Sequence, residues 1–270
     1  MNLNNKKIWG AIALLALVSS SIVFFRTRTL PGYGLTQAII PAISIVAGYS
    51  NSLVVMEDGS LWSLSVTQCT TEGISLTEEP EKIMDDVSAV FSEGPTTMII
   101  TTDGTLWSQG IDIQGQRHWL TRFMWMITPL STPRNYNPSA IMNNVVTIAM
   151  NTVNNSSYAM AITSDGGLWG WGYNRFGQLG TGTTENRRRN PVRVMDDVID
   201  VSVGGNRTFA VTSDRTLWGW GDNRFGWLGD GTTERRRTPV RIMDDVVYIT
   251  SNRTRNFAIT SDGGLWGCAY

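Results

Sequence analysis

The chain has 270 residues, of which 22 are Lys or Arg and 23 are Asp or Glu, so its formal net charge is -1. This near-neutral balance argues against bulk binding to nucleic acid and against a polyanionic protein, and the length allows one large domain or two smaller ones. Eleven Trp and 27 Gly favour many short strands joined by tight turns.

The first thirty residues predict a membrane anchor or a signal peptide. Lys6 and Lys7 precede an uncharged stretch, Ile8–Phe25, and two arginines follow it. As a helix that rises about 1.5 Å per residue, this stretch spans about 27 Å, close to the hydrocarbon thickness of a bilayer. Its length favours an uncleaved hydrophobic helix, with a cleaved signal peptide as the alternative. The rest of the chain, residues 31–270, would then be anchored facing outward or secreted.

Two short units recur after this segment and divide the chain into repeats. The first, Asp-Gly-x-Leu-Trp with one departure, begins at Asp58, Asp103, Asp165, Asp214 and Asp262. The second, Met-Asp-Asp-Val or Met-Asn-Asn-Val, begins at Met84, Met142, Met195 and Met243. Five units of about 45 to 50 residues fall within the period range of propeller blades.

The residues within one repeat predict four short strands. Apolar and polar side chains alternate over 198–203, 208–212 forms a second strand, and 217–221 follows a hairpin turn. The stretch 239–243 suits a sheet edge, because its proline lacks a backbone donor. The Asp-Gly dipeptides predict type I′ hairpin turns, and the adjacent Asp pairs also predict a turn. No helical period follows the anchor, so the domain is expected to be all-β.

The aromatic residues of these strands are expected to fill the space between blades. Glycine lets neighbouring blades approach, and tryptophan supplies a large apolar surface. We therefore expect Trp169, Trp218 and Trp266 to be buried between blades.

Two segments resemble the repeat of the regulator of chromosome condensation family. They are Trp169–Gly180, with the sequence Trp-Gly-Trp-Gly-Tyr-Asn-Arg-Phe-Gly-Gln-Leu-Gly, and its counterpart Trp218–Gly229. A partial unit at 107–116 and the shorter units extend the resemblance over most of residues 36–270. The resemblance implies an all-β β-propeller, commonly of seven blades, of which about five units are recognisable here. Proteins with this type of repeat include secreted bacterial propellers, among them inhibitors of β-lactamases. The sequence does not decide whether the blades of this chain close into a ring.

Residues with catalytic or metal-binding chemistry are sparse. The chain has one histidine, His118, and lacks a glycine-rich phosphate loop, so no triad, His-rich metal site or nucleotide loop is expected. Neighbouring carboxylates on a strand point to opposite faces, so the Asp pairs do not form an acid–base dyad. Cys69 and Cys268 leave a disulfide and two free thiols as alternatives. The sequence thus predicts no catalytic residue, cofactor, metal or small-molecule substrate.

Two groups of residues are candidates for binding a partner. The first comprises two arginine triplets at the same place in adjacent repeats: Arg187, Arg188, Arg189, Arg235, Arg236 and Arg237. They are either solvated loops neutralised by neighbouring glutamates or a docking patch for an acidic partner. The second is a longer loop that contains Trp119, Phe123 and Trp125, which either contact a partner or fill a void in an irregular blade.

These observations favour a non-catalytic, protein-binding scaffold outside the cytoplasm, for which enzyme inhibition is one form. Propellers expose loops around a rigid core, which suits recognition. The resemblance implies one alternative, nucleotide exchange on a nuclear GTPase with chromatin binding, which the apolar N-terminus opposes. A second alternative is an enzyme with an unrecognised carboxylate site. The expected partner is another protein, acidic if the arginines bind it, with no nucleic acid.

Overall fold

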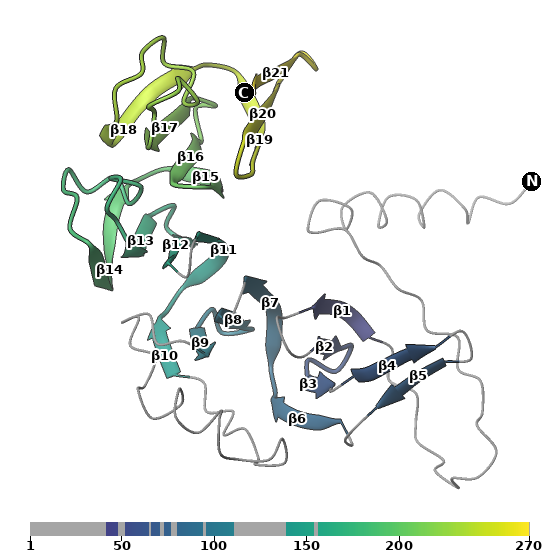
Figure 1. The fold of residues 1–270 in the computed structure, drawn as a ribbon. Coiled ribbons are helices and arrows are strands. Elements are labelled where there is room, and N and C mark those ends of the chain that lie inside the picture. The colour runs from purple at the N-terminus through teal and green to yellow at the C-terminus, as the bar shows by residue number, and fades with distance from the viewer. Residues whose placement is uncertain are drawn as a thin grey trace, which may run out of the picture.

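The domain consists of antiparallel sheets that follow one another along an open arc (Figure 1). The computed structural model describes residues 42–47, 52–64, 66–70, 73–76, 80–93, 96–110, 139–153 and 156–269, and these ranges hold strands and turns without a helix. Five sheets follow in chain order, and we name them blades 1 to 5. The expected all-β propeller architecture is confirmed.

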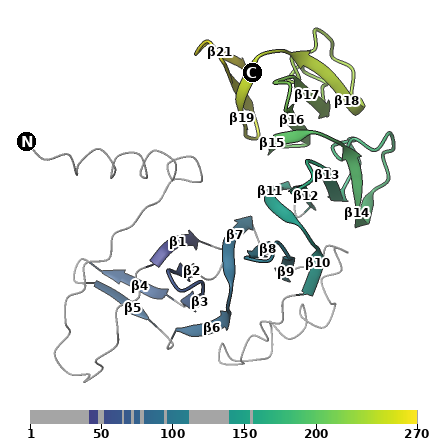
Figure 2. The same ribbon diagram turned by 180° about the vertical axis from the view of Figure 1, so that it is seen from behind.

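The strands of the blades follow the predicted order within each repeat. Blade 1 contains β1 (Ala42–Ala47), β2 (Ser52–Met56), β3 (Leu61–Leu64) and β6 (Glu81–Met84), and the hairpin β4 (Val66–Thr70) and β5 (Gly73–Leu76) lies beside it (Figure 2). Blade 2 contains β7 (Val87–Glu93), β8 (Thr96–Thr101), β9 (Leu106–Gly110) and β10 (Ser139–Met142). Blade 3 contains β11 (Val145–Val153), β12 (Ser156–Thr163), β13 (Leu168–Tyr173) and β14 (Arg187–Met195). Blade 4 contains β15 (Val198–Gly204), β16 (Arg207–Thr212), β17 (Leu217–Gly221) and β18 (Arg236–Met243). Blade 5 contains β19 (Val246–Ser251), β20 (Arg255–Thr260) and β21 (Leu265–Ala269).

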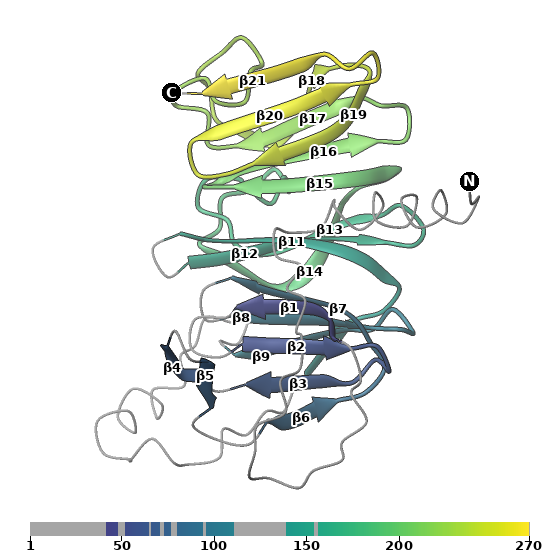
Figure 3. The same cartoon turned by 90° about the vertical axis from the view of Figure 1, so that its right-hand side faces the viewer.

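The first strand of each blade lies on the concave side of the arc, and the last strands β6, β10, β14 and β18 lie on the convex side (Figure 1). Contacts between neighbouring blades include the first strands, β1 with β7, β7 with β11, β11 with β15 and β15 with β19. Seen from the side, blades 1 and 2 lie at one end of the arc, blades 4 and 5 at the other end, and blade 3 between them (Figure 3).

The core lies between the blades, where each sheet covers the next. The leucine of the Asp-Gly-x-Leu-Trp unit shows this, because Leu106, Leu168 and Leu217 are all buried, each in a different core cluster between blades. Burying one leucine stabilises the fold by about 1.5–3 kcal/mol. In blade 5 the equivalent Leu265 is 70% exposed, since no further blade covers it among the described residues.

The hairpin turns differ from the expected type. A type I′ turn needs positive φ at both central residues, whereas only the residue after the aspartate has it, as Gly166 does at 77°. The Gly166 amide donates to the Thr163 carbonyl (2.9 Å), and the Thr163 amide donates to the Gly167 carbonyl (2.9 Å). This is a type I turn followed by a left-handed residue in a bulge. The type I′ prediction was wrong, because Asp-Gly marks a turn without fixing which residue is left-handed.

The adjacent Asp and Asn pairs form turns, as expected, and these turns also join the blades. The second residue of each pair has a φ of 58° or 59°: Asp86, Asn144, Asp197 and Asp245. At one joint the Val198 amide donates to the Gly166 carbonyl (2.9 Å), and the Ser213 amide donates to the Asp197 carbonyl (2.8 Å). Equivalent hydrogen bonds occur at the other joints. At each joint, the turn at the Asp or Asn pair between two blades is therefore hydrogen-bonded to the hairpin turns of both blades.

A different tryptophan from the expected one is buried between blades. Trp169 and Trp218 are only half-buried, and Trp266 is 59% exposed, whereas Trp171 and Trp220 are at most 1% exposed. Trp169 and Trp218 sit beside the hairpin turns, where each indole N–H donates to a threonine hydroxyl at 3.2 Å. Two residues further along the strand, Trp171 and Trp220 reach the neighbouring blade. The alternation of residues along a strand predicts which side of the sheet a tryptophan lies on, but it does not predict how deeply that tryptophan is buried between blades.

Several sequence predictions fall outside the described residues. They are the hydrophobic helix Ile8–Phe25, the aromatic loop with Trp119, Phe123 and Trp125, and the side chains of Cys69 and Cys268. Within the ranges that the structure covers, no helix is long and apolar enough to cross a membrane.

Candidate functional site

The two arginine triplets lie at the start of the last strands of blades 3 and 4, since β14 begins at Arg187 and β18 begins one residue after Arg235. Arg188 pairs with Gly172 across β13 and β14, and Arg236 pairs with the equivalent Gly221 across β17 and β18. The shared register places Arg187–Arg189 and Arg235–Arg237 at equivalent positions of consecutive blades, as the sequence spacing predicted. Both triplets therefore lie on the same side of the arc.

The loop before each triplet is held by a buried asparagine. Asn174 and Asn223 are fully buried, and their Oδ1 atoms accept the amides of Leu179 (3.0 Å) and Leu228 (2.9 Å). Asparagine suits this position, because its amide accepts and donates hydrogen bonds within a turn. The same two leucines pack into the cores between blades, so the loops are fixed to the sheets beneath them.

The loop of blade 3 rests on the triplet of blade 4. The Gly182 amide donates to the Arg237 carbonyl (2.8 Å). Gly177 has a φ of 77°, and a Cβ there would lie 3.0 Å from the Cα of Arg237, so this approach requires glycine. The arginine-bearing ends of blades 3 and 4 thus form one continuous surface.

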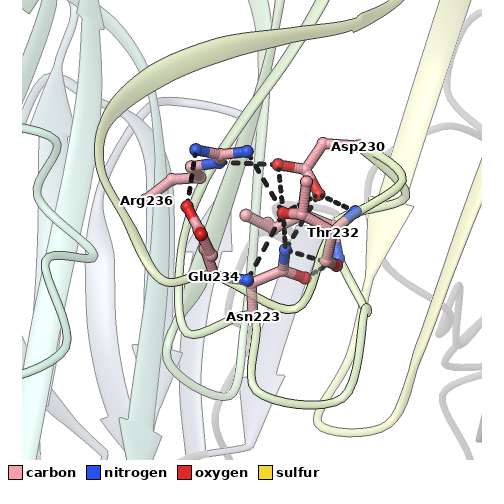
Figure 4. Close-up of polar contacts among 6 residues, drawn as sticks. Asn223, Asp230, Thr232, Glu234 and Arg236 are labelled. Carbon is pink, nitrogen blue, oxygen red and sulfur yellow. Dashed lines mark hydrogen bonds and ion pairs between the residues drawn. The ribbon is translucent and has the colours of Figure 1, made fainter.

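Arg236 is held by carboxylates and is part of the loop framework. Its guanidinium lies between the carboxylates of Asp230 and Glu234, at 2.6 Å and 3.6 Å (Figure 4). Thr232 and Asn223 also donate to Asp230. Burial raises the pKa of Asp230, but the hydrogen bonds from Arg236, Thr232 and Asn223 outweigh it and hold that pKa below its ordinary value. Asp230 therefore stays ionised at neutral pH.

An aromatic ring joins the two blades at this surface. Phe176 lies under the guanidinium groups of Arg235, at 4.9 Å, and Arg224, at 5.4 Å. Such cation–π contacts contribute about 0.5–1 kcal/mol each at exposed sites. Phe225, the counterpart of Phe176 in blade 4, is 58% exposed, so the surface presents an accessible aromatic ring beside its charges.

The arginines outnumber the carboxylates that neutralise them. We define the arginine rim as Arg175, Arg187, Arg188, Arg189, Arg224, Arg235, Arg236 and Arg237. Four carboxylates lie in the same loops: Glu185 binds Arg188, Asp222 binds Arg224, and Asp230 and Glu234 both bind Arg236. Among the described residues, the other five arginines have no ion pair, and Arg175, Arg189 and Arg237 are exposed.

The rim combines the two alternatives drawn from the sequence. The expected neutralisation by Glu185 and Glu234 is present, yet it reaches only two arginines of the six in the triplets. Arg175, Phe176, Arg224 and Phe225 were not singled out as candidates. The signal that identifies them is the Asn-Arg-Phe-Gly sequence, which occurs at the same place in both repeats.

The chemistry available at this rim is binding of negative charge. Unpaired guanidinium groups form forked hydrogen bonds with carboxylates, and an exposed phenylalanine adds apolar contact. No group of three or more His, Cys, Asp or Glu side chains that could hold a metal occurs in the described part of the chain.

Sequence comparison finds known repeats in blades 3 to 5. A model of the regulator of chromosome condensation (RCC1) repeat matches residues 165–211 and 215–253, and a second RCC1 repeat model matches residues 198–226. The ultraviolet-B receptor UVR8 of Arabidopsis thaliana is 47% identical over 55 residues, which is 19% of this chain and 12% of the receptor.

Solved structures share the fold over most of the chain. Yeast Prp20p superposes with a TM-score of 0.62 at 15% identity, covering 85% of this chain and 58% of that one. A structure of Kap60 bound to yeast RCC1 (Prp20) gives a TM-score of 0.61 at 15% identity, covering 85% and 56%. Human WBSCR16 gives 0.60 at 19% identity, covering 84% and 61%. The chain thus spans about three fifths of the length of these propellers.

Proposed function

Because the chain is an RCC1-repeat protein of the β-propeller fold, we propose that it is a non-catalytic scaffold that binds an acidic segment of a partner protein at the arginine rim. The observation that carries the proposal is the charge balance of the rim. Three arginines bind the four carboxylates of these loops, and the other five have no ion pair in the described part of the chain and are left for a partner. Inhibition of an enzyme is one form that such binding would take.

The similar proteins support a protein partner. The solved relatives include a complex with Kap60 and a study of binding to Gsp1p and histones. Those partners belong to the proteins named, and this chain spans only part of their length. What supports an acidic partner is the rim itself, since like charges repel and the rim arginines lie in adjacent loops.

Two pairs of arginines on the same two strands allow a matched test. Arg189 and Arg237 are exposed members of the rim, while Arg193 and Arg241 are exposed at the other end of β14 and β18. The double variants R189S/R237S and R193S/R241S remove equal charge from equivalent strands. The probe is a ten-residue oligoglutamate peptide, with oligoglutamine as the uncharged control, measured by titration at 50 mM and 300 mM salt.

The rim variant should bind oligoglutamate about tenfold more weakly than wild type at 50 mM salt, since two charge contacts of about 0.5–1 kcal/mol are lost. The control variant should bind as wild type does, and high salt should weaken all binding. Equal losses in both double variants would show that only net charge matters and would overturn the proposal. Tight binding of oligoglutamine would overturn it as well.

The proposed scaffold lies outside the cytoplasm. The support for this part is the apolar stretch Ile8–Phe25 behind two lysines. Protease treatment of intact cells tests it, because an outward-facing or secreted domain is accessible and a cytoplasmic domain stays intact.

A further inference from the structure

The joint between blades 3 and 4 contains a slot that a tryptophan fills. Trp220 is fully buried there, and its indole N–H donates to the Gln178 carbonyl (2.9 Å). A Cβ on Gly180 would lie 2.8 Å from that indole nitrogen and 3.0 Å from Val194, so this glycine and this valine form one wall of the slot. The slot also lies within the apolar cluster shared by the two blades.

The same slot exists between blades 4 and 5, but the chain has no tryptophan for it. Trp220 pairs with Thr208 across β16 and β17, and in blade 5 the equivalent pair across β20 and β21 is Cys268 with Asn256. Cysteine therefore occupies the register position of the slot tryptophan. Cysteine has a much smaller side chain than tryptophan, so the sequence supplies no indole at this register position.

A cavity of about 270 Å³ lies at this position. Its walls include Gly229 and Ile242, the counterparts of Gly180 and Val194 that enclose Trp220 one blade earlier. The other lining is mostly apolar, with Phe209, Leu228 and Ile249 among it. An apolar cavity of only about 150 Å³ in another protein holds benzene, so this space is large enough for a bicyclic aromatic ring.

The cavity also retains the hydrogen-bond acceptor for an indole. The Gln178 carbonyl accepts two bonds, from the Thr208 hydroxyl (2.8 Å) and from Trp220. Its counterpart, the Trp227 carbonyl, accepts the Asn256 amide group (2.8 Å), which leaves the second lone pair of that oxygen for another donor. Among the described residues no second donor reaches it. The Trp227 ring is held by the Arg207 guanidinium at 4.3 Å.

We infer that the cavity between blades 4 and 5 is a binding site for a planar bicyclic aromatic molecule with an N–H donor, the indole class. The ligand would occupy the space that Trp220 fills one blade earlier and would donate its N–H to the Trp227 carbonyl. This site is separate from the arginine rim and does not depend on the proposed function.

Calorimetric titration of the full chain with indole tests the site. We expect a Kd of about 0.1–1 mM, as befits nine heavy atoms with one hydrogen bond. Indene matches indole in its number of heavy atoms but lacks the N–H donor, and it should bind at least fivefold more weakly. No heat of binding with indole at millimolar concentration would overturn the inference, and so would equal affinity for both compounds.

Substitutions at position 268 locate the binding. Cys268→Trp should fill the slot, abolish indole binding and raise the melting temperature, while Cys268→Ala should bind indole as wild type does. If the tryptophan variant does not fold, Cys268→Phe serves as a smaller filling residue. Unchanged indole affinity in a folded Trp or Phe variant would place the ligand elsewhere and contradict the inference.

Discussion

Arg215 holds a backbone conformation that glycine adopts in the other four repeats. Its φ is 68°, and the equivalent Gly59, Gly104, Gly166 and Gly263 have φ values of 77–86°. A side chain in this left-handed region costs about 1–2 kcal/mol, because Cβ approaches the following carbonyl oxygen. Arg215 keeps the turn because its own carbonyl accepts the Val246 amide (2.9 Å) at the joint with blade 5.

We therefore expect Arg215→Gly to raise the free energy of unfolding by about 0.5–1 kcal/mol, after the greater freedom of glycine in the unfolded chain is subtracted. Urea unfolding measures the change. Gly263→Ala is the reciprocal control. A Cβ at this position meets nothing within 4 Å, so the expected loss in unfolding free energy reports the backbone conformation alone. A destabilised Arg215→Gly variant would contradict this account of the turn.

The turn aspartates make stability depend on acid pH. Hydrogen bonds from the neighbouring Ser or Thr lower the pKa of each one: Asp58, Asp103, Asp165, Asp214 and Asp262. For Asp165 the Thr163 hydroxyl and then Arg193 bring the pKa from 3.8 to about 2. A lowered folded-state pKa stabilises the fold above pH 3.8, and this contribution is lost as pH falls toward 2.

Unfolding free energies measured between pH 5 and pH 2 should thus fall steadily. Replacing all five aspartates by Asn keeps a side-chain acceptor and removes the titrating charge, so the fall should become shallower. An unchanged slope in the fivefold variant would assign the acid sensitivity to other carboxylates.

At the scale of the element, the second tryptophan of the Trp-Gly-Trp-Gly strand joins the blades. Trp220 lies in the core between blades 3 and 4, while Trp218, two residues earlier on β17, is half-buried beside the turn. Trp220→Ala should lower the free energy of unfolding by about 3–5 kcal/mol, since a large buried ring is lost and a cavity remains.

Trp218→Ala is the matched control on the same strand, and we expect it to cost less than half as much. Chemical denaturation of both variants measures the difference. A larger loss of unfolding free energy in Trp218→Ala than in Trp220→Ala would contradict this account and would support Trp218 as the tryptophan that joins the blades.

The sequence predicted most of the elements and missed some of their geometry. Short strands, hairpin turns and repeat boundaries follow from alternation, Asp-Gly dipeptides and spacing, which are local properties. The burial of Trp220 and the bulge after each turn depend on the neighbouring blade and on backbone φ, which a single strand does not encode. That Cys268 takes the register position of Trp220 became visible only when the strand registers were compared.

At the scale of the molecule, the arc places equivalent loops of blades 3 and 4 on one side. The position of the arginine triplets followed from the 48-residue offset between them. Which arginines are neutralised did not follow, because Asp222 and Asp230 bind Arg224 and Arg236 through a folded loop. The resulting surface has five arginines without an ion pair to any residue that the structure describes, together with an exposed phenylalanine, and it is the central feature of the proposed function.

Hydrogen exchange followed by mass spectrometry tests that function most directly, with the full chain at low salt and saturating oligoglutamate. The account predicts slower exchange in the rim segments 174–190 and 223–238, with no change at the opposite ends of the same strands, 193–197 and 241–245. Protection of the opposite ends, or none in either rim segment, would contradict the proposal that the arginine rim binds an acidic partner.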